Sequence, residues 1–175
     1  MPAFDKPLAS AIAHFFSSEC ASVLDIGCGP GLYLEFMVGR MKGPLVGLEP
    51  LISVEGEGWR IIPIDVTSGN PDNLGPFDLV LCLEVAEHIA RDKHAALFDA
   101  IARKAPRWVV FSGAVPGQTG WGHVSCRPET EWMSEFEARG YRPVPSLSIW
   151  LRSMAYQSWF QQNLLVFLRK GNLCS

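Results

Sequence analysis

The sequence predicts an α/β fold in which a mainly parallel sheet is covered by helices on both faces. Apolar runs of four to six residues alternate with stretches of helical periodicity along most of the chain, and this alternation is typical of βαβ units. The chain has 175 residues, of which 48% are hydrophobic and 19% are charged. That size and composition suit one packed domain, so we expect a single domain over residues 1–175.

The first part of the chain contains three predicted strands and two predicted helices. In chain order these are a helix at residues 8–17, a strand at 22–26, a helix at 32–40, and strands at 45–48 and 60–64. Gly43 and Pro44 end the second helix, because proline cannot continue a helical hydrogen-bond ladder. Only ten residues separate Glu49 from Arg60, and they include one proline and two glycines. We therefore expect no full crossover helix between the second and third strands.

The second part of the chain continues the alternation. In chain order it contains a predicted strand at 77–81, a helix at 86–104, a strand at 108–112, a helix at 128–140, a strand at 141–144, a short aromatic helix at 153–160 and a strand at 164–168. The helix at 86–104 is expected to bury Ile89, Leu97, Ala100 and Ile101. Residues 113–122 include four glycines and one proline. We expect them to form a loop at the carboxyl end of a strand, where ligands of open α/β sheets bind.

Three alternate glycines, Gly27, Gly29 and Gly31, follow the first predicted strand. Residues without a Cβ let backbone N–H groups approach a ligand closely. The second predicted strand leads into Glu49, about 20 residues further on, where an acidic side chain can accept hydrogen bonds from ribose hydroxyls. The arrangement therefore predicts a strand, loop and helix that bind a nucleoside.

The spacing of the glycines argues against two common nucleotide-binding motifs. A dinucleotide fingerprint has its third glycine five places after the first, and Leu32 occupies that position. A phosphate-binding P-loop places a lysine after its glycines, whereas residues 23–36 contain no basic residue. Instead, Asp25 stands two places before the first glycine, and Gly31 four places after it.

Asp25 and the alternate glycines resemble the first motif of the class I S-adenosylmethionine-dependent methyltransferases. The resemblance extends from the strand at 22–26 to the strand at 164–168. It implies a Rossmann-like methyltransferase fold with a sheet of seven strands or slightly fewer, and S-adenosyl-L-methionine as the cofactor. The residues that it implies for cofactor binding are Asp25, Gly27, Cys28, Gly29, Gly31, Glu49, Asp65, Val66 and Leu83.

The resemblance also implies a role for each part of this set. The glycine loop passes the methionine part of the cofactor, with Cys28 as a small residue in a tight turn. Glu49 meets the ribose, Asp65 and Val66 meet the adenine, and the backbone near Leu83 contacts the methionine end. The roles of Glu49 and Asp65 suit their chemistry, because carboxylates accept hydrogen bonds from the adenine amino group and the ribose diol.

Residues 77–88 resemble the fourth strand of the family and the turn after it, which borders the transferred methyl group. The resemblance implies that Glu84 and His88 face the methyl acceptor. His123, in a glycine-rich loop, is a further candidate, so the predicted catalytic residues are His88, His123 and Glu84. Positioning two reactants in line can supply ~7–11 kcal/mol, whereas a general base adds about 10²–10⁴-fold, so a base is useful but not obligatory. The alternative role for His88 is a structural one at the start of a helix.

We expect methyl transfer to an oxygen or nitrogen atom of a small acceptor, sugar-like or anionic. Four aromatic residues are candidates to stack on a planar acceptor, or to pack in the core: Trp121, Trp150, Tyr156 and Trp159. The chain has no acidic residue after Glu137, and its last part is basic through Arg139, Arg142, Arg152, Arg169 and Lys170. These residues form either a solvated face or an anion-binding site.

Two alternatives to a methyltransferase stay open: a nicotinamide-dinucleotide enzyme, and a noncatalytic subunit that binds a protein or RNA partner.

The net charge, the cysteine content and the lengths of the apolar runs bear on the partners, the metal content and the location of the protein. A net charge of −3 disfavours nonspecific binding to nucleic acid. Five cysteines without a Cys-x-x-Cys pair argue against a disulfide framework and a structural zinc site, and we expect no metal. No run approaches the ~18 apolar residues of a membrane helix, so we expect a cytoplasmic protein with no membrane contact. A homodimer or a partner subunit could complete the pocket.

Overall fold

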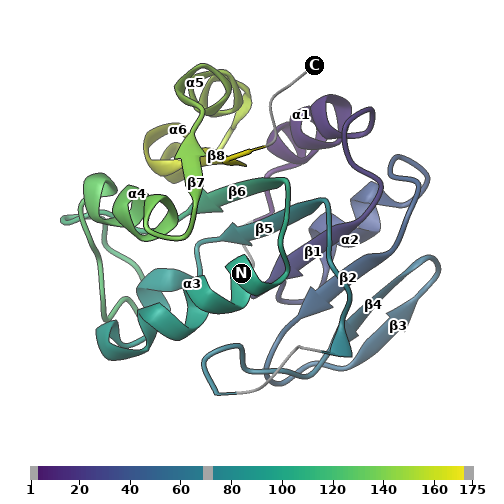
Figure 1. Cartoon of the computed structure of the whole chain (residues 1–175), viewed down its shortest axis with the longest axis horizontal. Helices are drawn as coiled ribbons and strands as arrows, with labels where there is room; N and C mark the ends of the chain where they lie inside the picture. The colour runs from purple at the N-terminus through teal and green to yellow at the C-terminus, as the bar shows by residue number, and fades with distance from the viewer. Residues whose placement is uncertain (1–3, 69–72, 172–175) are drawn as a thin grey trace.

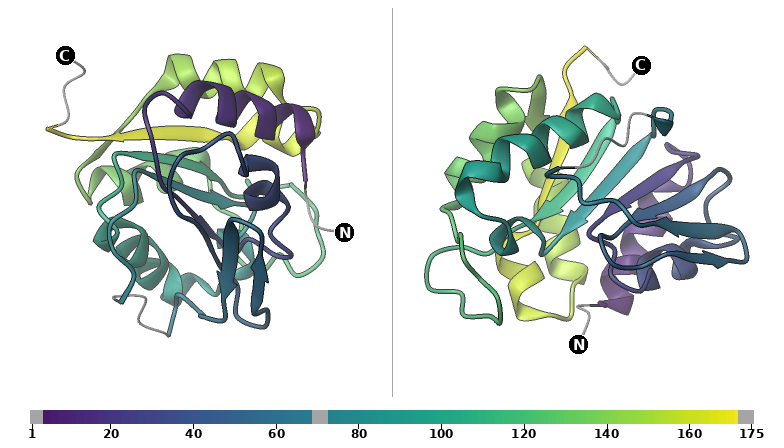
Figure 2. Two further views of the ribbon diagram at one scale, coloured as in Figure 1. Left: turned by 90° about the vertical axis from the view of Figure 1, so that its right-hand side faces the viewer. Right: turned by 90° about the horizontal axis from the view of Figure 1, so that it is seen from below.

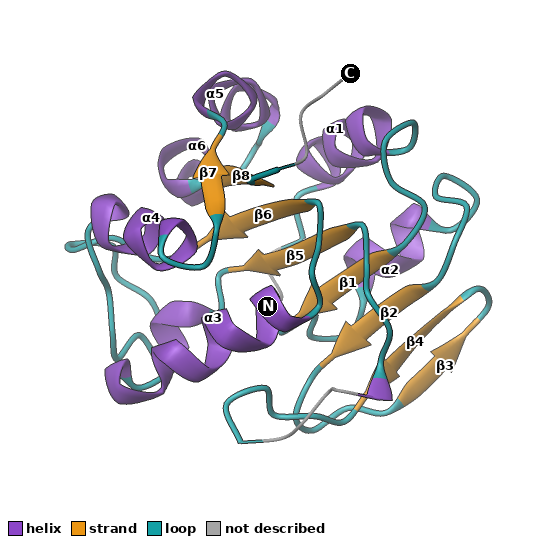
Figure 3. Ribbon diagram, viewed as in Figure 1, coloured by secondary structure: helices purple, strands orange, loops and turns teal. Residues whose placement is uncertain are grey.

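A computed structural model describes residues 4–68 and 73–171, and these residues form one eight-stranded sheet with helices on both faces (Figure 1, Figure 3). The strand order is β3-β4-β2-β1-β5-β6-β8-β7. The strands are β1 (Val23–Ile26), β2 (Leu45–Leu48), β3 (Val54–Gly56), β4 (Trp59–Ile62), β5 (Leu79–Leu83), β6 (Trp108–Ser112), β7 (Tyr141–Pro143) and β8 (Leu165–Arg169). β1, β2, β4, β5 and β6 pair in parallel, whereas β3 pairs antiparallel with β4, and β8 pairs antiparallel with both β6 and β7. The predicted α/β class is confirmed.

Two layers of helices cover the sheet (Figure 2). On one face lie α1 (Lys6–Phe16), α2 (Leu32–Met37), α5 (Pro145–Met154) and α6 (Ser158–Asn163); on the other lie α3 (His94–Arg103) and α4 (Glu129–Glu137). Successive residues of the central strands enter opposite cores: Leu81 packs with the first group, and Val80 and Cys82 pack with the second. Because both faces of the sheet are buried, the sequences of the central strands are continuous apolar runs.

Most of the predicted strands lie where the sequence placed them. β2 and β6 coincide with the predicted ranges, and β1, β5 and β8 differ by one or two residues at their ends. The helices predicted at 8–17 and 128–140 correspond to α1 and α4, while the helix predicted at 32–40 ends earlier, at Met37. Among the described residues, none of the helices combines the length and apolar character that crossing a membrane would require.

The sheet contains a strand that the sequence did not predict. β3 forms a hairpin with β4 through the two residues Glu57 and Gly58, and Gly58 has a φ of +82°, which suits a tight hairpin turn. The short connection after Glu49 therefore lacks a crossover helix, as expected, but it adds an antiparallel strand at the edge. The prediction of seven strands or fewer was wrong for this reason.

The helix predicted at 86–104 is interrupted. Its first part consists of the short 3-10 helices η2 (Ala86–His88) and η3 (Arg91–Lys93), and only α3 is a regular helix. Ile89 between them is extended and only partly buried. The buried His94 ring explains the break, because its Nε2 bonds the carbonyl oxygens of Ala86 (2.9 Å) and Ile89 (3.0 Å). A side chain thus satisfies carbonyl groups that a continuous helix would have bonded to backbone N–H groups.

The helix predicted at 153–160 was also wrong, because the chain there is the end of α5, an extended link and α6. The link is held by Asp5, the buried N-cap of α1, whose Oδ2 accepts hydrogen bonds from the backbone N–H groups of Tyr156 and Gln157 (both 2.7 Å). This contact joins residues about 150 positions apart. Local sequence patterns carry no information on such a contact.

Candidate active site

The carboxyl ends of the parallel strands border a cavity of about 860 Å³. The loop after β6 closes one side of it. Its lining residues are Ile26, Gly27, Leu48, Glu49, Pro50, Ile64, Asp65, Val66, Glu84, Val85, His88, Ile89, Gln118, Thr119, Gly120, Trp121, Gly122, His123 and Trp159. A second cavity of about 250 Å³ is lined by Asp25, the glycine loop and Leu83, and it shares Gly27, Glu84 and His88 with the first. The two cavities therefore meet at the end of β5.

The glycine loop joins β1 to α2 in a conformation that side chains cannot easily adopt. Gly27 and Gly31 have φ values of +70° and +84°, in the left-handed region that favours glycine. A Cβ on Gly27 would lie 2.4 Å from Val85 Cγ2, and a Cβ on Gly31 would lie 2.5 Å from the Trp59 ring. Gly27 borders both cavities, whereas Gly31 borders neither and instead caps α2.

Asp25 lies at the floor of the smaller cavity, and its side chain is almost fully buried. It is 3% exposed, and its Oδ2 has no hydrogen-bond partner among the described residues. Burial, together with the negative charge of Glu49, raises the pKa of Asp25 to about 8. A buried oxygen without a donor costs folding free energy. We therefore interpret Asp25 as a group that serves a ligand rather than the fold.

Replacing Asp25 by Asn is expected to stabilise the ligand-free protein more at pH 8 than at pH 5. The folded pKa of Asp25 is about 8 against a usual value of 3.8, so its contribution to stability is present at low pH and is lost as the pH rises toward 8. The asparagine side chain does not titrate, and the gain at pH 8 should reach about 1–3 kcal/mol. Urea unfolding at both pH values measures it, with the exposed Asp92→Asn as the control. An equal effect at both pH values would contradict the assignment.

The predicted nucleoside residues surround the larger cavity. Glu49 Oε2 accepts a hydrogen bond from the backbone N–H of Gly29 (3.1 Å), which joins the ribose candidate to the glycine loop. Asp65 is exposed, and its carboxylate is bonded by Thr67 and Ser68, hydrogen bonds that lower its pKa. The Asp65 carboxylate therefore stabilises the turn at residues 65–68. A ligand that binds Asp65 would share its carboxylate oxygens with Thr67 and Ser68. Val66 is buried beside it in the core.

The remaining predicted cofactor residues line the smaller cavity. Leu83 ends β5, and Cys28 lies in the tight turn with its Sγ 3.5 Å from the carbonyl oxygen of Gly29. Burial raises the pKa of the Cys28 thiol, so it is a poor nucleophile. Of the nine residues that the sequence predicted for cofactor binding, the structure brings eight to the two cavities, and Gly31 supports the loop from outside them.

Glu84 is held firmly at the junction of the two cavities. It has a φ of +56°, unusual for a residue with a side chain, and its backbone N–H donates to Ser112 Oγ (3.0 Å). Its Oε2 accepts from Gln118 Nε2 (2.9 Å) and its Oε1 from Asn163 Nδ2 (3.1 Å). Strained backbone that is held by several contacts is typical of functional sites. The sequence did not indicate Gln118 or Asn163.

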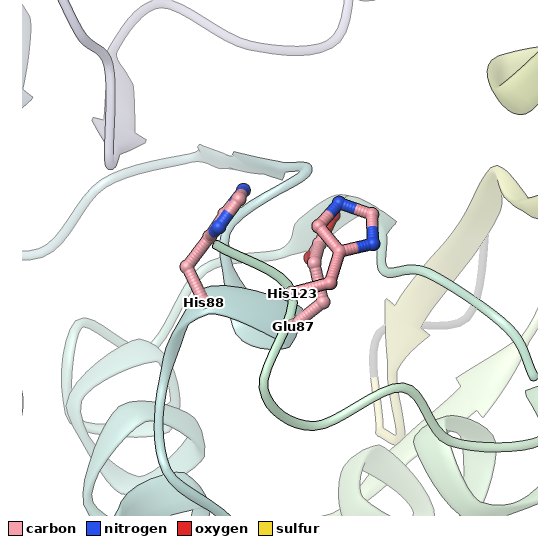
Figure 4. A group of neighbouring side chains, drawn as sticks. All are labelled: Glu87, His88 and His123. Carbon is pink, nitrogen blue, oxygen red and sulfur yellow. The ribbon is translucent and has the colours of Figure 1, made fainter. Parts of the chain in front are cut away.

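His88 and His123 both line the larger cavity, and their rings lie side by side in an edge-to-face arrangement with centroids 5.1 Å apart (Figure 4). Nδ1 of His88 lies 3.1 Å from the carbonyl oxygen of Gly122, and Nδ1 of His123 lies 3.2 Å from that of Gln118. A carbonyl oxygen only accepts hydrogen bonds, so each Nδ1 carries the hydrogen. In the neutral rings, both Nε2 atoms are left with a lone pair.

Glu87 is a site residue that sequence reasoning missed. Its side chain is 0% exposed, and neither carboxylate oxygen has a hydrogen-bond partner among the described residues. His123 Nε2 is 3.9 Å from Oε1. Burial and the nearby Glu84 raise the pKa of Glu87 to about 8. The available signal was its position, because Glu87 lies between the candidates Glu84 and His88 in the turn after β5.

The other candidates divide between the cavity and the rest of the molecule. Trp121 and Trp159 border the cavity, whereas Trp150 packs against Phe15, and Tyr156 is exposed. None of the five basic residues of the last part lines either cavity. Two of them pair with acids instead: Arg139 with Asp99 and Glu135, and Arg152 with Glu129. These residues give no support to an anion-binding site there.

The charges around the two cavities have one sign. Among the described residues, the linings contain Asp25, Glu49, Asp65 and Glu84, and no lysine or arginine. A cleft that is lined by carboxylates and partly closed from solvent attracts cations and disfavours anions. The site is therefore suited to a positively charged ligand that also carries donors for carboxylates.

Comparison with known proteins agrees with this geometry. A family model described as a methyltransferase domain matches residues 4–146. A ubiquinone biosynthesis O-methyltransferase from Bordetella parapertussis is 30% identical over 104 residues, which are 51% of this chain and 41% of that protein. The chain spans less than half the length of the curated relatives it matches.

Solved methyltransferase structures share the fold. The sugar N-methyltransferase KedS8 from Streptoalloteichus sp. superposes with a TM-score of 0.69 at 15% identity, over 94% of this chain and 87% of that one. The S-adenosylmethionine-bound amino pentose methyltransferase CalS10 from Micromonospora echinaspora has a TM-score of 0.66 at 17% identity, over 92% of this chain and 89% of that one. At such identities the likeness concerns the fold alone.

Proposed function

Because this chain belongs to the class I S-adenosylmethionine-dependent methyltransferases, we propose that it binds S-adenosyl-L-methionine and transfers the methyl group to a hydroxyl oxygen of a small, uncharged acceptor. The observation that carries the proposal is the lining of the two cavities, which has four carboxylates and no lysine or arginine among the described residues. Membership of this family sets aside the alternative of a nicotinamide-dinucleotide enzyme.

The residues of the smaller cavity fit the methionine part of this cofactor. The sulfonium and the ammonium of that part are cations, and the unpartnered Oδ2 of Asp25 lies on this side. A nearby cation favours the ionised form of a buried carboxyl group. Gly27 borders both cavities, and the collision of a Cβ with Val85 keeps this part of their wall free of a side chain. When bound, the cofactor supplies an electrophilic methyl carbon and a neutral thioether as the leaving group.

The residues of the larger cavity fit the nucleoside and the acceptor. Glu49 and Asp65 would accept hydrogen bonds from the ribose and the adenine, as predicted from the sequence. We place the acceptor hydroxyl at His88 and His123, because both rings line the larger cavity and His88 also borders the smaller one. Glu87 lies buried behind them, with its Oε1 3.9 Å from His123 Nε2. Holding the hydroxyl in line with the methyl carbon is the main contribution that the protein makes.

The lining also restricts the acceptor. Trp121, Trp159 and Ile89 border the larger cavity, and they suit an acceptor with an apolar or planar body. An anionic acceptor would find no lysine or arginine there among the described residues. We favour an oxygen acceptor over nitrogen, since the Bordetella relative is named as an O-methyltransferase. The nucleoside must share the 860 Å³, so the acceptor is small.

The proposal is tested by ligand-induced stabilisation and by methyl transfer. S-adenosylhomocysteine at 100 times its Kd should stabilise the chain by about 2.7 kcal/mol, which raises the Tm by roughly 5–10 °C, whereas NADH should have no effect. Labelled S-adenosylmethionine should then methylate uncharged phenols or polyols in preference to dicarboxylates and amines. An unchanged Tm with S-adenosylhomocysteine would reject cofactor binding. Binding without transfer to any of these classes would favour the noncatalytic subunit.

A further inference from the structure

We propose that Glu87, His88 and His123 form a binding site for a divalent transition-metal ion at the acceptor end of the larger cavity. One ligand atom from each of the three side chains lies within 4.8 Å of the other two (Figure 4). Two of the residues are adjacent in η2, and the third comes from the loop after β6. The sequence pattern did not indicate a metal, because this cluster contains no cysteine pair and forms only in the folded chain.

The buried carboxylate of Glu87 is the first observation that points to a cation. A fully buried carboxylate is retained only where something compensates for its lost hydration. No donor among the described residues makes a well-aligned hydrogen bond to either oxygen of Glu87, and its side chain is 0% exposed. The nearby backbone N–H groups of Glu87 and Ala114 lower its pKa less than burial and Glu84 raise it. The backbone of Glu87 is well anchored by comparison, since its carbonyl oxygen accepts from the N–H groups of Val124 and Ser125. The fold therefore holds the residue in place but satisfies its carboxylate poorly.

The hydrogen bonds of the two histidines give a second, independent observation. Both Nδ1 atoms lie against carbonyl oxygens, at 3.1 Å in His88 and 3.2 Å in His123. Histidines that bind metals are commonly oriented in this way, with one ring nitrogen bonded to a backbone carbonyl and the other nitrogen free to coordinate. In His123 the free nitrogen, Nε2, is 3.9 Å from Glu87 Oε1. When Glu87 is ionised, its oxygen and the free nitrogen of His123 both present lone pairs to each other, and a cation between them would satisfy both.

The distances allow a metal after a small closure. Metal–nitrogen and metal–oxygen bonds of about 2.0–2.2 Å place neighbouring ligand atoms about 3–3.5 Å apart, so the 4.8 Å span must shorten by roughly 1.3–1.8 Å. His88 is exposed and has one hydrogen bond to the loop among the contacts described, so its ring can rotate. Gly120 and Gly122 leave space for the two rings, because a Cβ on Gly120 would lie 2.2 Å from His123 Nε2.

The donor set indicates the class of metal. Two imidazoles and one carboxylate suit Zn²⁺, Mn²⁺, Fe²⁺ or Co²⁺, whereas Mg²⁺ and Ca²⁺ prefer sites made only of oxygen. Cys126 is not part of the set, because its Sγ lies 3.8 Å from Nδ1 of His123, on the side of the ring that does not coordinate. Glu84, the neighbour that raises the pKa of Glu87, adds a second negative charge. Two carboxylates offset the charge of a divalent ion beside a cationic cofactor.

The role of the ion rests on the proposed function. Three protein ligands leave open positions, and an acceptor oxygen bound there would lose its proton to solvent more easily. The oxygen then forms the new O–C bond as the C–S bond breaks, and the electron pair of that bond stays on sulfur. In this arrangement the two histidines hold a metal and do not act as the general base that the sequence suggested. Acceptors with a second oxygen next to the hydroxyl should be preferred, because they can chelate.

Metal binding can be tested without the acceptor or the cofactor. The full chain is stripped with EDTA and titrated with Zn²⁺ and Mn²⁺ by calorimetry, with Mg²⁺ as the comparison. We expect one Zn²⁺ or Mn²⁺ per chain, and weak or no binding of Mg²⁺. His123→Ala and Glu87→Gln should weaken binding by about 100-fold or more. Two controls should leave the titration unchanged: His14→Ala, which is exposed on α1, and Cys126→Ser.

Two results would overturn the metal site. One is the absence of binding by the unmodified chain, and the other is a titration that Glu87→Gln and His123→Ala do not alter. Circular dichroism and the Tm shift with S-adenosylhomocysteine show whether each variant is folded and still binds the cofactor. If that shift persists while no metal binds, the metal site fails and the proposed methyltransferase function stands. If metal binds to a chain that shows no shift, the proposed function fails instead.

Discussion

Replacing Gly27 by Ala should reduce the affinity for S-adenosylhomocysteine by roughly 10- to 100-fold. The new Cβ would lie 2.4 Å from Val85 Cγ2 in a backbone conformation with a φ of +70°. Overpacking of this kind costs about 1–3 kcal/mol, and because Gly27 and Val85 both line the larger cavity, a shift of either residue changes the cavity wall. Isothermal titration of the variant against the unmodified chain measures the loss.

Two further variants separate the collision from the backbone strain. Gly39→Ala has the same strain, since Gly39 has a φ of +72°, but its Cβ would meet no atom within 4 Å, and Gly39 lines neither cavity. It should lower stability without changing affinity. Val85→Ala in the Gly27→Ala background removes the two methyl carbons that lie closest, so it should restore part of the affinity. A Gly27→Ala chain with unchanged affinity would show that the glycine loop does not contact the ligand.

Replacing Glu87 by Gln should raise the free energy of unfolding by about 1–3 kcal/mol and lower kcat by about 100-fold or more. Gln has the shape of Glu and no charge, so it removes the cost of a buried carboxylate that has no hydrogen-bond donor among the described residues. The loss of activity follows from the loss of an ionisable carboxyl oxygen beside His123 Nε2, 3.9 Å away. Urea unfolding and methyl-transfer rates on the same preparations measure the two effects.

The opposite signs of the two effects make this prediction specific. A structural role for Glu87 would give lower stability, with a loss of activity no greater than the loss of folded protein. Glu137→Gln is the matched control, because Glu137 is exposed at the end of α4 and lines neither cavity. It should change neither quantity. A more stable Glu87→Gln chain with full activity would remove Glu87 from the site.

Much of the framework could be predicted from the sequence, because it depends on neighbouring residues. β2 and β6 are short apolar runs bounded by residues that break strands, and both were predicted to the residue. Gly27 and Glu49 end their strands at the same edge of a parallel sheet, so their proximity follows from the order of the strands. The contact between Gly29 N and Glu49 Oε2 (3.1 Å) agrees with that inference.

The sequence by itself determined the α/β class, the position of the glycine loop and the placement of eight predicted residues at the two cavities. The tertiary structure alone decided the hairpin of β3, the link between α5 and α6, and the pairing of Glu87 with His123. His123 reaches Glu87 because the loop after β6 donates the backbone N–H groups of Val124 and Ser125 to the Glu87 carbonyl oxygen. Such contacts join segments far apart in the chain, and their free energy depends on the space and partners that only the folded core provides.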